Sequence, residues 1–236
     1  MLNNKTFLAV IPARGGSKGI PNKNIVDVHG KPLIQYTIDA ALQSKYIDKV
    51  VVSTEDEAIS NVARKCGAEI PFIRPMELAS DNAKTIDTVI HALKTMEQEG
   101  SKFDYVVLLQ PTQPLRESWH IDESIEKILF SKTDGLVSVS KVNDHPILVR
   151  TLNDKDEVSR ILEENSTVRR QEFPDYYKVN GAIYINRVNE SFTEETSLND
   201  NKLAYVMDGK YDLDIDETLD LELLRLVLGG EINIES

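Results

Sequence analysis

Residues 6–24 read TFLAVIPARGGSKGIPNKN, and this stretch decides the fold. Its first seven residues form a continuous apolar run, which is typical of a strand buried on both faces of a parallel sheet. The run passes directly into a loop that contains Gly15, Gly16 and Gly19. In an open α/β sheet, the carboxyl end of a strand is the usual place for a ligand crevice. The stretch therefore predicts an α/β fold with a binding loop after the first strand.

The loop matches neither of two standard phosphate-binding motifs. Its glycines give G-G-x-x-G, and no Ser or Thr follows a Gly-Lys pair anywhere in the chain. Glycine still lets backbone N–H groups approach an anion closely, and Arg14, Lys18 and Lys23 add positive charge. The loop chemistry favours phosphate binding over an ordinary connection. The failed spacing disfavours an NAD-dependent dehydrogenase.

Strands and helices alternate through the front half of the chain. Apolar runs suited to strands are separated by stretches with apolar residues at helical spacing, which indicates βαβ units in a mostly parallel, Rossmann-like sheet with helices on both faces. We expect strands at 6–12, 48–54, 68–75, 103–111 and 134–142, and helices at 32–44, 55–67, 84–100 and 118–131, the last with Ser118 as its N-cap.

The alternation stops after residue 142. We expect a β-rich insertion at about 143–176 that contains a hairpin with its turn at 153–156. Strands at 181–187 and 202–208 and an amphipathic helix from residue 217 follow. We therefore expect residues 1–236 to form one domain with this insertion.

Composition and charge limit the class of function. The chain has 236 residues and a net charge of −12, which disfavours nucleic-acid binding. Its single cysteine suits a reducing compartment, and no apolar run is long enough to cross a bilayer. We expect a cytoplasmic protein without a membrane partner.

The charge is uneven along the chain. Residues 1–50 contain seven Lys or Arg and three Asp or Glu. Residues 190–236 contain three Lys or Arg and thirteen Asp or Glu. In the acidic part, DLDID (212–216) places Asp212, Asp214 and Asp216 on one face if it forms a strand. Such carboxylates repel one another unless a cation lies between them, which suits a metal site. Ordinary surface charge and a helix N-cap at Asp216 stay open as alternatives, and Asp216 could serve both as N-cap and as metal ligand.

Five segments, in order along the chain, resemble the acylneuraminate cytidylyltransferase family, whose members make CMP-sialic acids. They are ARGGSKGIPNKN (13–24), RPMELASDNA (74–83), LQPTQPLR (109–116), NGAIYIN (180–186) and DIDETLDL (214–221). The resemblance implies a nucleotidyltransferase fold. It also implies transfer of CMP from CTP to the anomeric hydroxyl of a nonulosonic acid, with release of pyrophosphate.

The resemblance also implies roles for the nucleotide side. Arg14, Lys23 and Asp214 are the expected catalytic residues, and Asp214 and Asp216 would hold Mg²⁺ or another divalent cation. The expected nucleotide-binding residues are Ala13, Arg14, Gly15, Gly16, Ser17, Lys18, Lys23, Asn24, Ser80 and Asp81.

On the sugar side, the resemblance implies Gln110, Arg170, Asn180 and Tyr184 as contacts. Arg170 would face the sugar carboxylate, with Arg169 as the competing candidate. Arg116 is interpreted as a residue that holds its loop in place. The family commonly has a lysine soon after an H-P pair, whereas this chain has Arg150 slightly later.

N-acetylneuraminic acid is the first candidate sugar. Legionaminic, pseudaminic, Kdn and Kdo acids share its α-keto acid head and stay open as alternatives. By resemblance we also expect a stand-alone transferase and a homodimer built through the insertion. A non-enzymatic nucleotide-sensing module is the alternative of a different class, and the aspartate pair argues against it.

Overall fold

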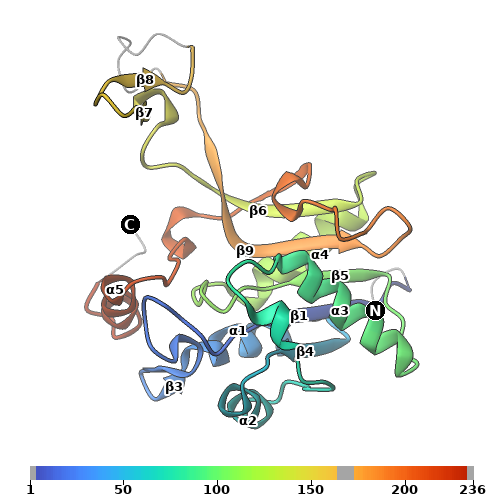
Figure 1. Ribbon diagram of the computed structural model, residues 1–236. Coiled ribbons are helices and arrows are strands. Elements are labelled where there is room, and N and C mark those ends of the chain that lie inside the picture. Colours follow the sequence, from blue (N-terminus) through green and yellow to red (C-terminus); the bar gives the residue numbers. More distant parts are fainter. Residues whose placement is uncertain (1–3, 164–172, 233–236) are drawn as a thin grey trace.

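The computed structural model describes residues 4–163 and 173–232, and its centre is a six-stranded sheet (Figure 1). The strand order is β10-β6-β9-β5-β1-β4. β9 runs antiparallel to both of its neighbours, and the other pairings in the sheet are parallel. This confirms the predicted mostly parallel α/β fold. The strands are β1 (Phe7–Pro12), β4 (Lys49–Ser53), β5 (Tyr105–Leu108), β6 (Gly135–Lys141), β9 (Tyr177–Arg187) and β10 (Leu203–Val206).

Helices cover both faces of this sheet because alternate strand residues point to opposite sides. Phe7, Ala9 and Ile11 pack into one apolar core with residues of α1, α2 and α4. Leu8 and Val10, between them, pack into a second core with α3. The helices are α1 (Leu33–Leu42), α2 (Glu57–Lys65), α3 (Thr85–Gln98), α4 (Ser118–Leu129) and α5 (Thr218–Leu228).

Two local predictions are wrong. The expected strand at 68–75 is only an isolated bridge from Glu69 to Val51, because Pro71 and Pro75 lack the N–H groups that a strand needs. The N-cap of α4 is Glu117 and not Ser118. Glu117 accepts from the N–H of His120, and the His120 ring accepts from the N–H of Glu117, so the two residues form a reciprocal capping box.

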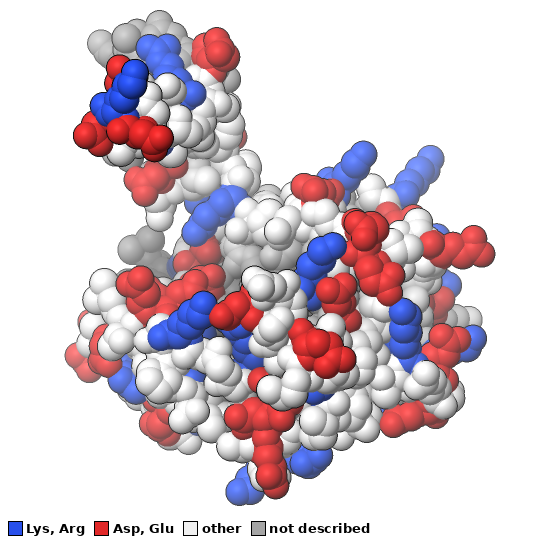
Figure 2. All heavy atoms as spheres, viewed as in Figure 1, with Lys and Arg blue, Asp and Glu red and all other residues white. Residues whose placement is uncertain are grey.

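An arm leaves the sheet between β6 and β9, and Figure 1 and the space-filling view in Figure 2 show it projecting from the body of the molecule. Within the described residues, β7 (Arg150–Leu152) and β8 (Val158–Arg160) pair only with each other, antiparallel. Asn153 turns the hairpin, since its side-chain oxygen accepts the N–H groups of Lys155 and Glu157. The arm carries several exposed apolar side chains: Leu148, Val149, Leu152, Val158 and Ile161.

A third apolar cluster brings the two ends of the chain together. Leu221 and Leu224 of α5 pack against Ile20, which lies in the glycine-rich loop, and against Ile215 in the acidic segment. Because Ile20 and Ile215 are both buried in this cluster, the loop after β1 and the segment before α5 are held side by side. This packing positions the candidate site.

Candidate active site

A pocket lies between the glycine-rich loop and the acidic segment, beyond the carboxyl ends of β1 and β5. Its volume is about 530 Å³. A pocket at this edge of an open α/β sheet is where such folds bind ligands. Its wall combines cationic, amide and carboxylate side chains and includes Arg14, Ser17, Lys18, Lys23, Asn24, Arg74, Ser80, Asp81, Gln110, Thr112, Asp214 and Asp216.

Lys23 connects the two sides of the pocket. Its ammonium group donates to the Asp216 carboxylate at 2.9 Å and to the Ile215 carbonyl oxygen at 2.8 Å. The Lys23 side chain is 14% exposed, so its charge is held in place. Gly19 permits this approach, because a Cβ there would lie 2.3 Å from the Asp216 carbonyl oxygen. The basic loop and the acidic segment therefore face each other.

Two further cations of the loop meet at one carboxylate. Asp81 accepts from Arg14 Nη1 at 2.6 Å and from Lys18 Nζ at 2.8 Å. Hydrogen bonds from Lys18 and Arg14 lower the pKa of the Asp81 carboxyl. Arg14 and Lys18 thus converge on a single anionic group at the mouth of the pocket, which is the arrangement that a phosphate also requires.

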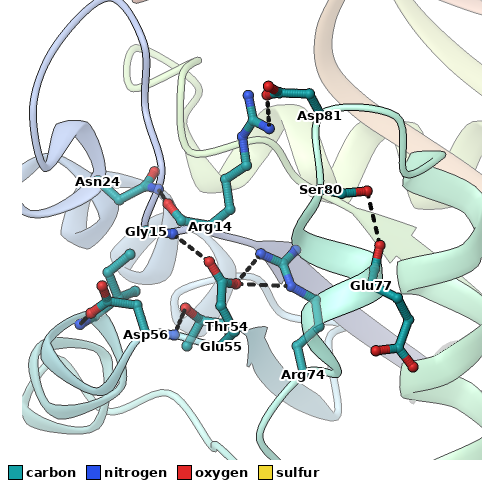
Figure 3. A network of polar contacts seen from close by, with 11 residues as sticks. Arg14, Gly15, Asn24, Thr54, Glu55, Asp56, Arg74, Glu77, Ser80 and Asp81 are labelled. Carbon is teal, nitrogen blue, oxygen red and sulfur yellow. Dashed lines mark hydrogen bonds and ion pairs between the residues drawn. The ribbon is translucent and has the colours of Figure 1, made fainter.

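A network that the sequence analysis missed lies behind the loop (Figure 3). Glu55 accepts the Gly15 N–H at 2.7 Å and also pairs with the buried guanidinium of Arg74. Asn24 donates to the Arg14 carbonyl oxygen at 2.9 Å. A signal was available, because Glu55 lies two residues beyond the carboxyl end of β4 and Arg74 lies in one of the five quoted segments.

Of the remaining predicted nucleotide-binding residues, some line the pocket and others do not. Ser17 and Ser80 line the pocket, and the Ser80 hydroxyl donates to the Glu77 carbonyl oxygen. Ala13 is buried and donates its N–H to Ser53. Gly15 is bonded to Glu55, and neither Gly15 nor Gly16 is among the lining residues of the pocket. The loop therefore presents its side chains, more than its glycine N–H groups, to the pocket.

The acidic segment is not a strand, which corrects the expectation for residues 212–216. Its three aspartates also have different partners. Asp212 accepts from the Ser140 hydroxyl and from Lys178, and Asp216 pairs with Lys23. Asp216 is not a helix N-cap either, since Glu217 takes that place in α5.

Asp214 has the least compensated charge of the three. Loss of hydration raises the pKa of its carboxyl, repulsion from Asp216 and Asp212 adds to the rise, and a hydrogen bond from Thr112 and the charge of Lys23 oppose it. Asp214 and Asp216 line the same pocket. Among the described residues, no group of three or more His, Cys, Asp or Glu side chains is arranged to hold a metal alone. Two carboxylates fit Mg²⁺ when substrate phosphates complete its shell.

A second pocket of about 410 Å³ adjoins the first, and Gln110 and Asp214 line both. It also contains Asn180 and Tyr184, so three of the four predicted sugar contacts come together; Arg170 and its competitor Arg169 lie outside the described residues. The Asn180 amide is occupied, since it accepts from Ser138 and the Ala182 N–H and donates to Met207. Tyr184 packs in the core and donates its hydroxyl to Asn199.

Arg116 holds the loop that carries Gln110. Its buried guanidinium donates to the carbonyl oxygens of Gln110 and Ala182. Burial lowers the pKa of Arg116 to about 9. Three residues before Arg116, Gln113 lines the second pocket, and its buried amide has no hydrogen-bond partner among the described residues. Gly181, with φ of +77°, leaves room for Gln110, because a Cβ there would lie 2.5 Å from the Gln110 amide oxygen.

A family model described as "Cytidylyltransferase" matches residues 8–231. The N-acylneuraminate cytidylyltransferase of Escherichia coli O18:K1:H7 is 37% identical over 92% of this chain and 51% of its own length. The chain thus spans about half the length of that relative. The pseudaminic acid cytidylyltransferase of Campylobacter jejuni serotype O:2 is 34% identical over 97% of this chain and 98% of its own. The CMP-N,N'-diacetyllegionaminic acid synthase of Legionella pneumophila is 36% identical over 98% of both.

Among solved structures, the CMP:2-keto-3-deoxy-manno-octonic acid synthetase complexed with CTP superposes with a TM-score of 0.70. The alignment covers 96% of this chain and all of that one at 21% identity, so the similarity concerns the fold. Within the residues that the structure describes, no helix is both long and apolar enough to span a membrane.

Proposed function

Because the chain belongs to the cytidylyltransferase family, we propose that it transfers CMP from CTP to the anomeric hydroxyl of a nonulosonic acid and releases pyrophosphate. One observation carries this proposal: Arg14, Lys18 and Lys23 line one pocket together with Asp214 and Asp216. That pocket opens beside a second one in which the sugar would lie.

In the proposed reaction the anomeric oxygen attacks the α-phosphorus of CTP, a new P–O bond forms, and the bond to the β-phosphate breaks. The hydroxyl loses its proton and pyrophosphate leaves. Such a transfer depends on in-line positioning and on neutralisation of phosphate charge. Arg14 and Lys23 supply fixed positive charge, and Gln110, which lines both pockets, would orient the sugar toward the phosphate.

We assign the metal site to Asp214 and Asp216. A divalent cation such as Mg²⁺ supplies Lewis-acid polarisation of the phosphate when it is bound. The raised pKa of Asp214 and the repulsion from Asp216 support this assignment, because a cation between the two carboxylates would relieve that repulsion. Without a bound cation, the ion pair with Lys23 keeps Asp216 at the pocket wall.

N-acetylneuraminic acid is the first candidate sugar, because a curated relative named for N-acylneuraminate has 37% identity to this chain. Pseudaminic acid and legionaminic acid are two further candidates, since the relatives named for them match this chain along 98% of their own lengths. A pyrophosphate-release assay with CTP, Mg²⁺ and a panel of these acids tests the proposal. If none of these acids leads to pyrophosphate release, the proposal is contradicted. Pyrophosphate release in the absence of a sugar acid would also contradict it.

We further propose one domain over residues 1–236 whose insertion at 143–176 builds a homodimer. The exposed apolar side chains of the arm support the dimer, since Leu148, Leu152 and Val158 are not covered by other residues of one protomer. Sedimentation or light scattering that gives a monomer at micromolar concentration would contradict the dimer.

We also propose that the protein acts in a reducing compartment such as the cytoplasm, which its single cysteine, Cys66, supports.

A further inference from the structure

A carboxylate that the proposed reaction does not use lies between two walls of the nucleotide pocket. Glu55 follows β4, and its side chain is only 10% exposed. One of its oxygens accepts the Gly15 N–H at 2.7 Å, and the other accepts Nε and Nη2 of Arg74 (Figure 3). Glu55 therefore joins the glycine-rich loop to the segment after α2 that carries Arg74.

The contact with Gly15 fixes the orientation of one peptide group. The peptide that links Arg14 to Gly15 offers one carbonyl oxygen and one N–H. Asn24 donates to that oxygen at 2.9 Å, and Glu55 accepts from that N–H. Rotation of the peptide would break both hydrogen bonds, so the direction in which Arg14 leaves the backbone is set from both sides.

The contact with Arg74 fixes a buried cation. The Arg74 side chain is 4% exposed, and its guanidinium presents the Nε–Nη2 edge to Glu55, an arrangement that restrains both position and plane. Nη1 lies at the opposite corner and has no hydrogen-bond partner among the described residues. Arg74 lines the pocket, so Nη1 is the donor left for a molecule bound there.

We propose that Glu55 is a positioning residue for the nucleoside triphosphate, acting through both the Arg14–Gly15 peptide and the Arg74 guanidinium. It does not touch the reacting atoms. The Glu55 carboxylate fixes the backbone of Arg14, which would contact the phosphates, and the guanidinium of Arg74 before the nucleotide binds. Less conformational entropy is then lost when CTP binds. This proposal rests on the proposed function, since it assigns CTP to the pocket.

The substitution Glu55→Gln tests the role at constant shape. Gly15 and Arg74 donate to different oxygens of the carboxylate, and an amide replaces one of those oxygens by NH₂, which would meet one of the two donors. We expect the KM for CTP to rise about tenfold or more, as for loss of a charge-assisted hydrogen bond, while the KM for the sugar acid stays within about twofold. The matched control is Glu57→Gln in the first turn of α2, where Glu57 is exposed.

A double-mutant cycle with Arg74→Lys shows whether the two residues act together. Lysine keeps the charge but lacks the two-nitrogen edge, so the double variant should lose little more CTP affinity than either single variant. Full additivity would contradict the coupling. Should Glu55→Gln unfold at the assay temperature, calorimetric titration of Arg74→Lys with CTP gives the deciding readout, and wild-type affinity there would overturn the proposal.

The test separates this proposal from the proposed function. A wild-type chain that releases pyrophosphate, together with a Glu55→Gln variant of unchanged KM for CTP, would overturn the positioning role and leave the function standing. A wild-type chain that binds CTP in calorimetry but reacts with no sugar acid would overturn the function, while a loss of CTP affinity in Glu55→Gln would still support the positioning role. A wild-type chain that does not bind CTP would overturn both.

Discussion

Lys23 Nζ lies 2.9 Å from Asp216 Oδ1, although 193 residues separate them in the sequence. This ion pair joins the loop after the first strand to the segment before the last helix. Lys23 also donates to the Ile215 carbonyl oxygen, so the contact involves both the backbone and the side chain of the acidic segment. The pair places Asp214, two residues before Asp216, in the wall of the same pocket as Arg14.

We expect Asp214→Asn to lower turnover at least about 100-fold without unfolding the protein, because the amide cannot replace a carboxylate ligand of a divalent cation. Asp214 bears repulsion in the folded state, so loss of its charge should not destabilise the fold. The measurements are pyrophosphate release and thermal unfolding. EDTA should abolish wild-type activity and Mg²⁺ restore it, whereas excess Mg²⁺ should not rescue the variant. Near-normal turnover in Asp214→Asn would remove the metal assignment.

We expect Arg14→Ala to raise the KM for CTP about tenfold or more and to change the KM for the sugar acid little. Arg14 lines the larger pocket but not the adjoining one. Lys18→Ala is the matched comparison. The Lys18 side chain is 78% exposed, against 38% for Arg14, so its charge is more screened and its removal should have a smaller effect. If Arg14→Ala raised the KM for the sugar acid as much as the KM for CTP, or if Lys18→Ala had the same effect on the KM for CTP as Arg14→Ala, the assignment of Arg14 to the nucleotide would be contradicted.

We expect Gly19→Ala to destabilise the protein by about 1–3 kcal/mol and to weaken CTP use, because the added Cβ would lie 2.3 Å from the Asp216 carbonyl oxygen. Backbone atoms must then move, and the Lys23–Asp216 contact moves with them. Gly16→Ala is the control within the same loop, since a Cβ at Gly16 meets no atom within 4 Å. Urea unfolding of the two variants measures the difference. Equal stabilities would show that the loop and the acidic segment are not in close contact.

The sequence was sufficient for elements whose pattern is local. Apolar runs such as 6–12 predicted β1, and helical spacing predicted α1 and α3 within a few residues. The strand expected at 68–75 failed because its apolar residues are interrupted by Pro71 and Pro75. The antiparallel direction of β9 had no local signal, since strand direction follows from how the arm between β6 and β9 returns to the sheet.

The site shows the same division. The charge counts alone did not decide whether the basic loop meets the acidic segment, whereas the family resemblance assigned both to one nucleotide, and the Lys23–Asp216 ion pair joins the two regions. The alternation in DLDID suggested a strand with three carboxylates on one face, but the segment is not a strand, and Asp212 pairs with Ser140 and Lys178. Glu55 escaped attention because its importance depends on Gly15 and Arg74, which lie 40 positions before it and 19 after it.

The acid stability of the fold should depend on His120. This histidine is buried against Trp119 and Tyr211 and lies next to the uncompensated charge of Arg116. Burial, with a smaller contribution from Arg116, lowers the pKa of His120 from 6.5 to about 4. Between these values the unfolded chain binds a proton that the folded chain does not. The free energy of unfolding should therefore fall as pH drops through this window, and the His120 contribution is fully present only above about pH 6.5.

His120→Gln isolates this effect, since glutamine at the same position can also accept the N–H of Glu117 and preserve the capping box. From pH 8 to pH 5 the wild type should lose about 2 kcal/mol more stability than the variant. Urea unfolding of both proteins at the two pH values measures this difference, and comparison with the variant cancels the titration of all other groups. Parallel losses in the two proteins would mean that His120 takes up its proton while the protein is still folded, and that the α4 terminus opens to water below neutral pH.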